Sequence, residues 1–145
     1  MPTAGRRSPR RDVLVDSSVA IPLVTIDHDH HRLVVEAVRG RRLGLAGHAA
    51  FETFSVLTRL PPPARRRPDA VERLLRVSFP ATRFLGADPA KSLFARLAEL
   101  GIAGGSVFDA LVGAVAVANG LPLLTRDGRA VDVYRVLDVD LELIV

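Results

Sequence analysis

Short apolar runs alternate along this chain with longer segments in which apolar residues recur every three or four positions. A continuous apolar run between polar residues is typical of a buried parallel strand, whereas the longer spacing is typical of an amphipathic helix. Strands are predicted over residues 12–15, 42–46, 82–85, 121–125 and 140–144. Helices are predicted up to about residue 24, and over residues 30–38, 49–60, 69–77, 89–100, 106–119 and 129–135. This alternation predicts an α/β fold with a mostly parallel sheet of about four or five strands, covered by helices on both faces.

Proline, glycine and small polar residues mark the predicted helix ends. The expected signals are a cap at Ser17 or Ser18, a stop at Pro61-Pro62-Pro63, an N-cap at Asp88 before Pro89, and a stop at Asn119-Gly120. In the helix over residues 49–60, the side chains of Phe51, Phe54, Leu57 and Thr58 are expected to face inward. The helix over residues 106–119 is almost wholly apolar, so we expect it to be buried on most sides.

Length and charge indicate one domain with a basic N-terminal arm. The 145 residues are 48% hydrophobic, enough for one compact core. Residues 1–11 contain four arginines and no acid, while residues 12–145 contain 16 basic and 16 acidic residues, so the net charge of +4 lies in the arm. We therefore expect a disordered basic arm over residues 1–11 and a neutral domain over residues 12–145. Arginine outnumbers lysine nineteen to one, which genomic base composition explains better than selection for phosphate binding.

Several classes of protein are disfavoured by composition. The chain has no cysteine, which excludes disulfides and thiolate zinc sites. Its longest apolar run, residues 110–118 with glycine included, is too short to cross a bilayer, and no apolar segment of the signal-peptide kind follows the basic arm. We expect a cytoplasmic protein without membrane attachment.

Four carboxylates lie at the ends of apolar segments: Asp16, Glu52, Asp109 and Asp127. In parallel α/β sheets, sites form at the carboxyl ends of the strands, where Asp16 and Asp127 fall. Acids in such partly buried places need a compensating charge, and hard oxygen ligands suit Mg²⁺ or Mn²⁺. The sequence therefore favours a divalent-metal site.

The order of these segments resembles the PIN domain family, and within it the VapC-type toxins of bacterial toxin–antitoxin pairs. The motifs that carry the resemblance are Val-Leu-Val-Asp16-Ser-Ser, Glu52 on the helix after the second strand, Phe-Asp109-Ala-Leu-Val, and Leu-Leu-Thr125-Arg-Asp127. The resemblance implies a three-layer α/β/α sandwich and a ribonuclease whose acidic cluster holds Mg²⁺ or Mn²⁺. It also implies a small inhibitory antitoxin and a homodimer.

The resemblance and the chemistry together suggest roles for the acids. Asp16 and Asp109 are expected to bind metal directly, and Glu52 to bind it or to orient a water. Asp127 resembles the family's fourth acid, and Asp132 could supply an auxiliary one. Each has a simpler alternative: Asp16 as a helix cap, Asp109 in a capping box with Ser106, Asp127 in a turn, and Asp132 as an exposed helix residue.

Contacts with RNA are less clearly indicated. The hydroxyls of Ser18 and Thr125 could bond a carboxylate or a phosphate, or could simply cap. Arg65, Arg66 and Arg67 could bind RNA phosphates or an acidic antitoxin segment, or form a solvated loop. With one tyrosine and no tryptophan, no aromatic ladder for base stacking is predicted, so specificity would come from shape or hydrogen bonding.

An antitoxin could bind along the helices near residues 49–60 and 71–77. Their residues Val56, Leu60, Leu74 and Leu75 suit an amphipathic partner helix, but could equally fill the domain's own core or a homodimer interface. A partner arginine reaching the acids would compete with the metal.

Two other functions compete with the ribonuclease. A non-catalytic PIN-like module that binds RNA or protein would have lost an acid, whereas all four are present. A haloacid-dehalogenase-like phosphatase would need a second aspartate at position 18, where this chain has serine.

Overall fold

The computed structural model describes residues 11–145, so most of the arm predicted over residues 1–11 lies outside the described residues. The strands are β1 (Val13–Val15), β2 (Leu43–Leu45), β3 (Leu123–Thr125) and β4 (Leu141–Leu143). The helices are α1 (Ser17–Val24), α2 (His31–Val38), α3 (His48–Thr58), α4 (Pro68–Ser78), α5 (Ala87–Arg96), α6 (Ser106–Asn119) and α7 (Val131–Val136). The predicted order of strands and helices is confirmed, apart from one strand.

The four strands form one parallel sheet in the order β2-β1-β3-β4. Val15 lies opposite Leu45 on one side and Leu124 on the other, so β1 and β3 are the two central strands. Their carboxyl ends therefore adjoin, and the residues that follow each strand meet at one edge of the sheet. This edge carries Asp16 after β1 and Thr125 at the end of β3.

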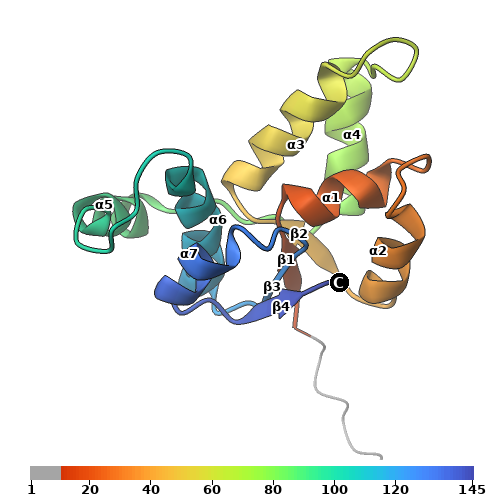
Figure 1. Ribbon diagram of the computed structural model, residues 1–145. Coiled ribbons are helices and arrows are strands. Elements are labelled where there is room, and N and C mark those ends of the chain that lie inside the picture. The colour runs from red at the N-terminus through yellow and green to blue at the C-terminus, as the bar shows by residue number, and fades with distance from the viewer. Residues whose placement is uncertain (1–10) are drawn as a thin grey trace, which may run out of the picture.

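Helices cover both faces of the sheet (Figure 1). Val13 and Val15 point to one face, where they pack in a core with α1, α2, α3 and α4. Leu14 points to the other face, where it packs with Val115 of α6 and Tyr134 of α7. Because side chains alternate along a strand, all three residues of β1 are buried, and the predicted three-layer sandwich is confirmed.

The prediction of a strand over residues 82–85 is wrong, since the structure has no strand there. This segment runs beside β2 but forms only one isolated bridge, between Ala46 and Arg83. The Leu45 amide donates to the hydroxyl of Thr82 (3.0 Å) instead of a backbone carbonyl, which interrupts a regular ladder. Gly44 permits the close crossing, since a Cβ there would lie 2.2 Å from the Ala81 carbonyl oxygen.

Two details of the helices also differ from expectation. Phe51 does not face inward: its side chain is 65% exposed. α3 buries Ala49, Thr53 and Leu57, which recur every four residues, and position 51 is about 200° around the helix from position 49. α5 begins at Ala87 with Gly86 before it, so Asp88 lies in the first turn and is not the N-cap.

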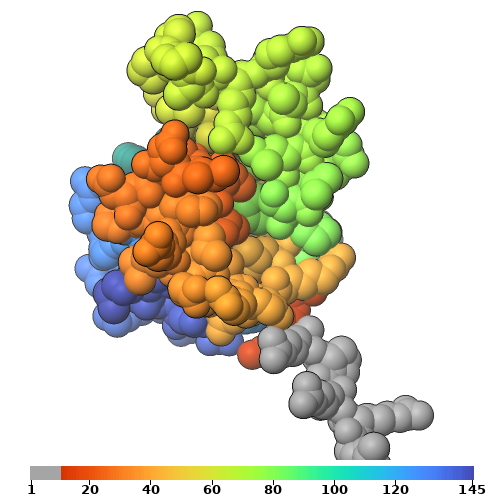
Figure 2. Space-filling view, turned by 90° about the vertical axis from the view of Figure 1, so that its right-hand side faces the viewer, coloured from red at the N-terminus to blue at the C-terminus, as the bar shows by residue number. Residues whose placement is uncertain are grey.

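The predicted end of α6 is confirmed, with Gly120 at φ 61° after Asn119. α3 and α4 extend beyond the sheet, and α1 and α2 cover the face seen in Figure 2. Within residues 11–145, no helix is both long and apolar enough to span a membrane.

Candidate functional site

Asp16 is the most enclosed acid at the carboxyl edge of the sheet. It follows β1 directly, with 5% of its surface exposed. One carboxylate oxygen, Oδ1, accepts hydrogen bonds from the backbone N–H (3.1 Å) and the hydroxyl (2.5 Å) of Ser18. The other, Oδ2, accepts from the hydroxyls of Thr125 (2.5 Å) and Tyr134 (2.9 Å). Asp16 is thus the cap of α1 and also the centre of a hydrogen-bonded network that joins β1, β3 and α7.

The hydroxyls of Ser18 and Thr125 tie the two central strand ends together. Ser18 Oγ accepts from the Arg126 amide (2.8 Å), and Thr125 Oγ1 accepts from the Asp127 amide (3.1 Å). Each hydroxyl therefore donates to Asp16 while it accepts from the backbone after β3. This leaves the carboxylate of Asp16 fixed in orientation.

Burial raises the pKa of the Asp16 carboxyl, and the hydrogen bonds from Ser18, Thr125 and Tyr134 oppose that rise. Desolvation is the larger effect, because it penalises the charged form of a group with almost no contact with water. Asp16 consequently carries its negative charge at an energetic cost that a bound cation would offset.

Glu52 lies one turn into α3, and its side chain contacts the start of α1. Its Oε2 accepts a hydrogen bond from Ser17 Oγ (2.9 Å), and its Oε1 lies 3.2 Å from His48 Nε2. Gly47, immediately before α3, has φ 51°, and a Cβ there would come within 2.7 Å of Val115 on α6. A glycine at this position therefore lets α3 start close to α6, which brings Glu52 towards Asp109.

Asp109 lies on the first turn of α6, and the alternative role for it, a capping box with Ser106, is excluded. The residue before the helix is Gly105, and no side chain caps the helix. The pKa of the Asp109 carboxyl is raised to about 6, first by burial and then by the negative charges of Asp127, Glu52 and Asp16. Asp109 is therefore near enough to each of the other three predicted acids to be repelled by its charge. The positive charge of Arg129 acts in the opposite direction.

Asp127 is both a turn residue and a member of this acidic group. Its Oδ1 accepts from the Arg129 amide (3.0 Å) and lies 3.8 Å from the Arg129 guanidinium. The side chain of Arg129 is otherwise solvent-exposed, so this cation stands beside the acids at the edge of the site.

Tyr134 is a site residue that the sequence analysis missed. Its ring is buried, and its hydroxyl donates to Asp16. Burial and the charge of Asp16 both raise the pKa of the Tyr134 phenol, so it remains a neutral donor. Gly113 on α6 leaves room for it, since a Cβ there would lie 3.1 Å from the ring. A signal was available: this is the one tyrosine of the chain, and a buried phenol needs a partner.

Ser17 and His48, which contact Glu52, were also missed as site residues. Nothing in their local sequence distinguishes them from ordinary helix-start residues. Their role depends on how α1 and α3 pack.

The structure does not bring every predicted site residue to this edge. Asp132 is exposed on the first turn of α7, and its charge is not among those that raise the pKa of Asp109. The arginine segment lies elsewhere: Arg66 donates to the carbonyl of Val24, at the far end of α1. Arg67 pairs with Asp69, and Arg65 donates to the carbonyl of Leu60. These arginines lie about a helix length from the acids, since both α1 and α3 separate them from that edge.

The four acids suit a hard divalent cation by the chemistry of their donors, since carboxylate oxygens are what Mg²⁺ and Mn²⁺ prefer. Within residues 11–145, however, no three acidic or histidine side chains already converge as a finished binding group. Glu52, Asp109 and Asp127 are only partly buried, so their carboxylates are open to an ion from solvent. The repulsion that raises the pKa of Asp109, which Arg129 offsets only in part, favours such an ion.

We expect the metal-free protein to become more resistant to heat as the pH falls from about 7.5 to about 5. The pKa of Asp109 is raised to about 6 in the folded state, and that of Asp16 is raised too. The folded state therefore binds more protons than the unfolded state in this range, so the free energy of unfolding falls as the pH rises through about 6. Melting temperatures of EDTA-treated protein across this range check the prediction.

The matched control is Asp109→Asn, which cannot titrate and should show a shallower dependence over the same range. Identical slopes in the two proteins would contradict the assignment of this effect to Asp109.

The fold and the site together define a class of protein: a three-layer α/β domain with a group of four carboxylates at the carboxyl edge of its parallel sheet. Comparison with known proteins makes the class specific. The family model of the PIN domain matches residues 13–136 of this chain. Ribonuclease VapC40 of Mycobacterium tuberculosis (strain CDC 1551 / Oshkosh) is 44% identical over 131 residues, which are 89% of this chain and 96% of that protein. Ribonuclease VapC27 of Mycobacterium tuberculosis (strain ATCC 25618 / H37Rv) is 44% identical over 125 residues, which are 86% of this chain and 91% of that protein.

Two solved structures share the fold. VapC20 of Mycobacterium tuberculosis, described as a toxin that cleaves the sarcin–ricin loop, matches with a TM-score of 0.64 at 20% identity, over 83% of this chain and 94% of that one. VapBC2 from Rickettsia felis, bound to a DNA fragment from its promoter, matches with a TM-score of 0.65 at 12% identity, over 92% of this chain and 98% of that one. The chain belongs to the PIN domain family, among its VapC-type ribonucleases.

Proposed function

We propose that this protein is the toxin of a toxin–antitoxin pair, an endoribonuclease that hydrolyses RNA with Mg²⁺ or Mn²⁺ held by Asp16, Asp109, Glu52 and Asp127. The observation that carries the proposal is the pairing of β1 with β3, which places Asp16 and Asp127 at one edge, with Asp109 close enough to both and to Glu52 for their charges to raise its pKa. Like charges gathered in this way disfavour one another's ionised form, and a bound cation would offset that cost. The ribonuclease relatives supply the substrate class.

Each side chain has a distinct part in this reaction. When bound, the divalent ion supplies positive charge against the phosphate and a Lewis acid for the attacking water. Ser18, Thr125 and Tyr134 hold the Asp16 carboxylate in one orientation, so it needs no rearrangement when substrate arrives. Ser17 and His48 hold Glu52. Arg129 stands where a phosphate oxygen could be neutralised.

The test is cleavage of RNA by purified protein after removal of metal with EDTA. We expect no cleavage without metal, and restoration by Mg²⁺ or Mn²⁺. Cleavage that persists in EDTA, or none with either ion, would contradict a metal-dependent ribonuclease. Binding of RNA without cleavage under all conditions would favour the non-catalytic alternative.

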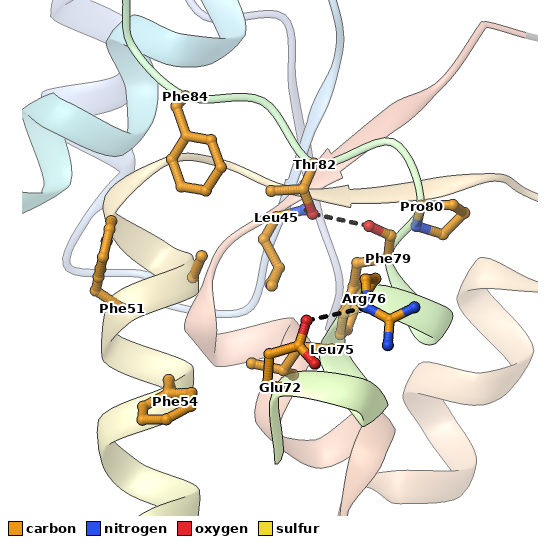
Figure 3. Close-up of a pocket in the computed structure, with 11 residues that line it drawn as sticks. Leu45, Phe51, Phe54, Glu72, Leu75, Arg76, Phe79, Pro80, Thr82 and Phe84 are labelled. Carbon is orange, nitrogen blue, oxygen red and sulfur yellow. Dashed lines mark hydrogen bonds and ion pairs between the residues drawn. The ribbon is translucent and has the colours of Figure 1, made fainter. Parts of the chain in front are cut away.

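The antitoxin is proposed to occupy an apolar groove between α3 and α4. The Rickettsia felis neighbour is a VapBC complex, which supports a partner of this kind. The groove, of about 570 Å³, is lined by Phe51 and Phe54 of α3, Leu75 of α4, and Phe79 and Phe84 beyond it (Figure 3). An amphipathic helix would place its apolar face in it and a basic side chain towards the acids.

The residues predicted for this surface from sequence need revision. Leu60, Leu74 and Leu75 pack against the domain's own core, and Val56 is not among the residues that line the groove. Leu75 is almost fully buried, so Leu75→Glu would destabilise the fold and would not test binding.

Ala50 offers a better test, because it lines the groove and, although it also packs against the core, it is only partly buried. We expect Ala50→Arg to fill the groove and to weaken binding of the antitoxin encoded beside this protein by about 10-fold or more, as expected for a centrally placed interface position. Ala95→Arg, on the exposed surface of α5, is the matched control. The measurement is titration calorimetry with the purified partner, and unchanged affinity in a folded Ala50→Arg variant would exclude this groove.

A further inference from the structure

Two stacked aromatic rings lie beside two acids of the acidic group. His48 of α3 and Phe108 of α6 stack with ring centroids 4.9 Å apart and ring planes inclined by 17°. His48 also touches Glu52, and Phe108 is the residue before Asp109, so this stacked pair belongs to the same edge as two of the acids. Phe108 is nevertheless 49% exposed. The pair therefore presents an open aromatic surface beside the carboxylates.

A second aromatic pair continues this surface. The ring centroids of Phe51, on α3, and Phe84, on the segment after α4, lie 6.0 Å apart (Figure 3). A cavity of about 210 Å³ is lined by His48, Phe51 and Phe84, and so connects the two pairs. The sequence analysis predicted no aromatic ladder for base stacking, and the structure adds these two ring pairs to that picture. The prediction rested on tyrosine and tryptophan, whereas the structure gathers phenylalanine and histidine.

We propose that the His48–Phe108 pair is a stacking site for one unpaired nucleobase of single-stranded RNA, adjacent to the phosphate that is cleaved. This inference rests on the proposed ribonuclease function and adds how the substrate is held. Stacking on an aromatic ring suits RNA, because unpaired bases expose their faces and any base can stack. His48 supports Phe108 from one side, which leaves the exposed side of the ring for the base.

The position of the pair favours RNA over a protein as the occupant in the active enzyme. Phe108 adjoins Asp109 and His48 contacts Glu52, so a protein covering these rings would also cover the acids. Acids that are to cleave RNA must remain open to it. The negative charge of the acids would repel a bare phosphate here, whereas a base carries no charge and can lie on the rings while its phosphate meets the metal.

The test compares wild-type protein with Phe108→Leu, which removes the ring but keeps an apolar side chain, and with Phe108→Tyr, which restores a ring. Phe94→Leu is the matched control, since Phe94 is 81% exposed on α5. The probe is a short single-stranded RNA cleaved by the wild-type protein with Mg²⁺ or Mn²⁺. Its analogues lack the base at one position at a time.

We expect Phe108→Leu to raise KM about tenfold with a smaller change in kcat, since loss of base–aromatic stacking weakens binding by roughly 5- to 150-fold. Phe108→Tyr and Phe94→Leu should resemble wild type. Removal of the base at one position beside the cleaved bond should raise the KM of the wild-type protein by a similar factor. The same removal should leave the KM of Phe108→Leu almost unchanged.

Three results would overturn this inference. One is equal KM for wild-type and Phe108→Leu proteins, and another is an equal base-removal penalty in both at every position. The third is an altered oligomeric mass or antitoxin affinity of Phe108→Leu with unchanged RNA cleavage, which would make the pair a protein interface. In each case the wild-type protein still cleaves RNA, so these failures differ from failure of the proposed function itself.

Discussion

Asp16→Asn should reduce metal-dependent RNA cleavage by more than the roughly 10- to 100-fold that loss of an outer partner of a metal site costs. Asp16 is the acid about which the site is built: it accepts four hydrogen bonds from three residues, and it is nearly excluded from water. An amide keeps the shape of the side chain but removes its charge and one acceptor oxygen. The variant therefore keeps the packing and loses the ligand.

The same variant should remain folded and, without metal, should melt no lower than the wild-type protein. Burial raises the pKa of the Asp16 carboxyl, so its ionised form destabilises the fold at neutral pH, and asparagine removes that cost. Cleavage assays and thermal melts on EDTA-treated protein, then with Mg²⁺ added, measure both effects. Full cleavage by a metal-reconstituted Asp16→Asn protein would remove Asp16 from the mechanism.

Asp109→Asn and Glu52→Gln should each lower turnover by about 10- to 100-fold, as expected when a ligand or the group that orients it is lost. Asp109 is close enough to the other three acids for the charge of each to raise its pKa. Glu52 is held by Ser17 and His48, which aim its carboxylate from α3. Steady-state cleavage at saturating Mg²⁺ separates lost turnover from weakened metal binding.

Asp132→Asn is the control for these two variants and should have a smaller effect. Asp132 carries the same charge but is exposed on α7, and it is not among the charges that raise the pKa of Asp109. An effect of Asp132→Asn as large as that of Asp109→Asn would show that the ranking of primary and auxiliary acids is wrong.

The position of Tyr134 extends the site beyond its carboxylates. A neutral phenol and two hydroxyls hold Asp16, and each comes from a different part of the chain. Groups that orient a metal ligand from outside are as much a part of such a site as the ligands themselves. The short helix α7 thus contributes to the site by placing Tyr134 against Asp16.

The sequence by itself determined the elements and the edge at which the acids gather. Apolar runs such as Val13–Val15 must be buried on both faces, and only a parallel sheet between helices permits this for several short strands. Parallel strands place their carboxyl ends at one edge, so Asp16 and Asp127 could be paired without any structure. Local signals such as Asn119-Gly120 also sufficed to end a helix.

Only the tertiary structure decided the features that depend on how elements pack. The segment over residues 82–85 has the composition of a strand, but the hydroxyl of Thr82 takes the place of a backbone acceptor beside β2. Phe51 looks like a core residue, yet the rotation of α3 that buries Ala49, Thr53 and Leu57 leaves it exposed. The contact of Tyr134 with Asp16 and the stack of His48 on Phe108 each join residues at least 60 positions apart. Periodicity records which face of a segment is apolar, but it does not record which distant side chain that face will meet.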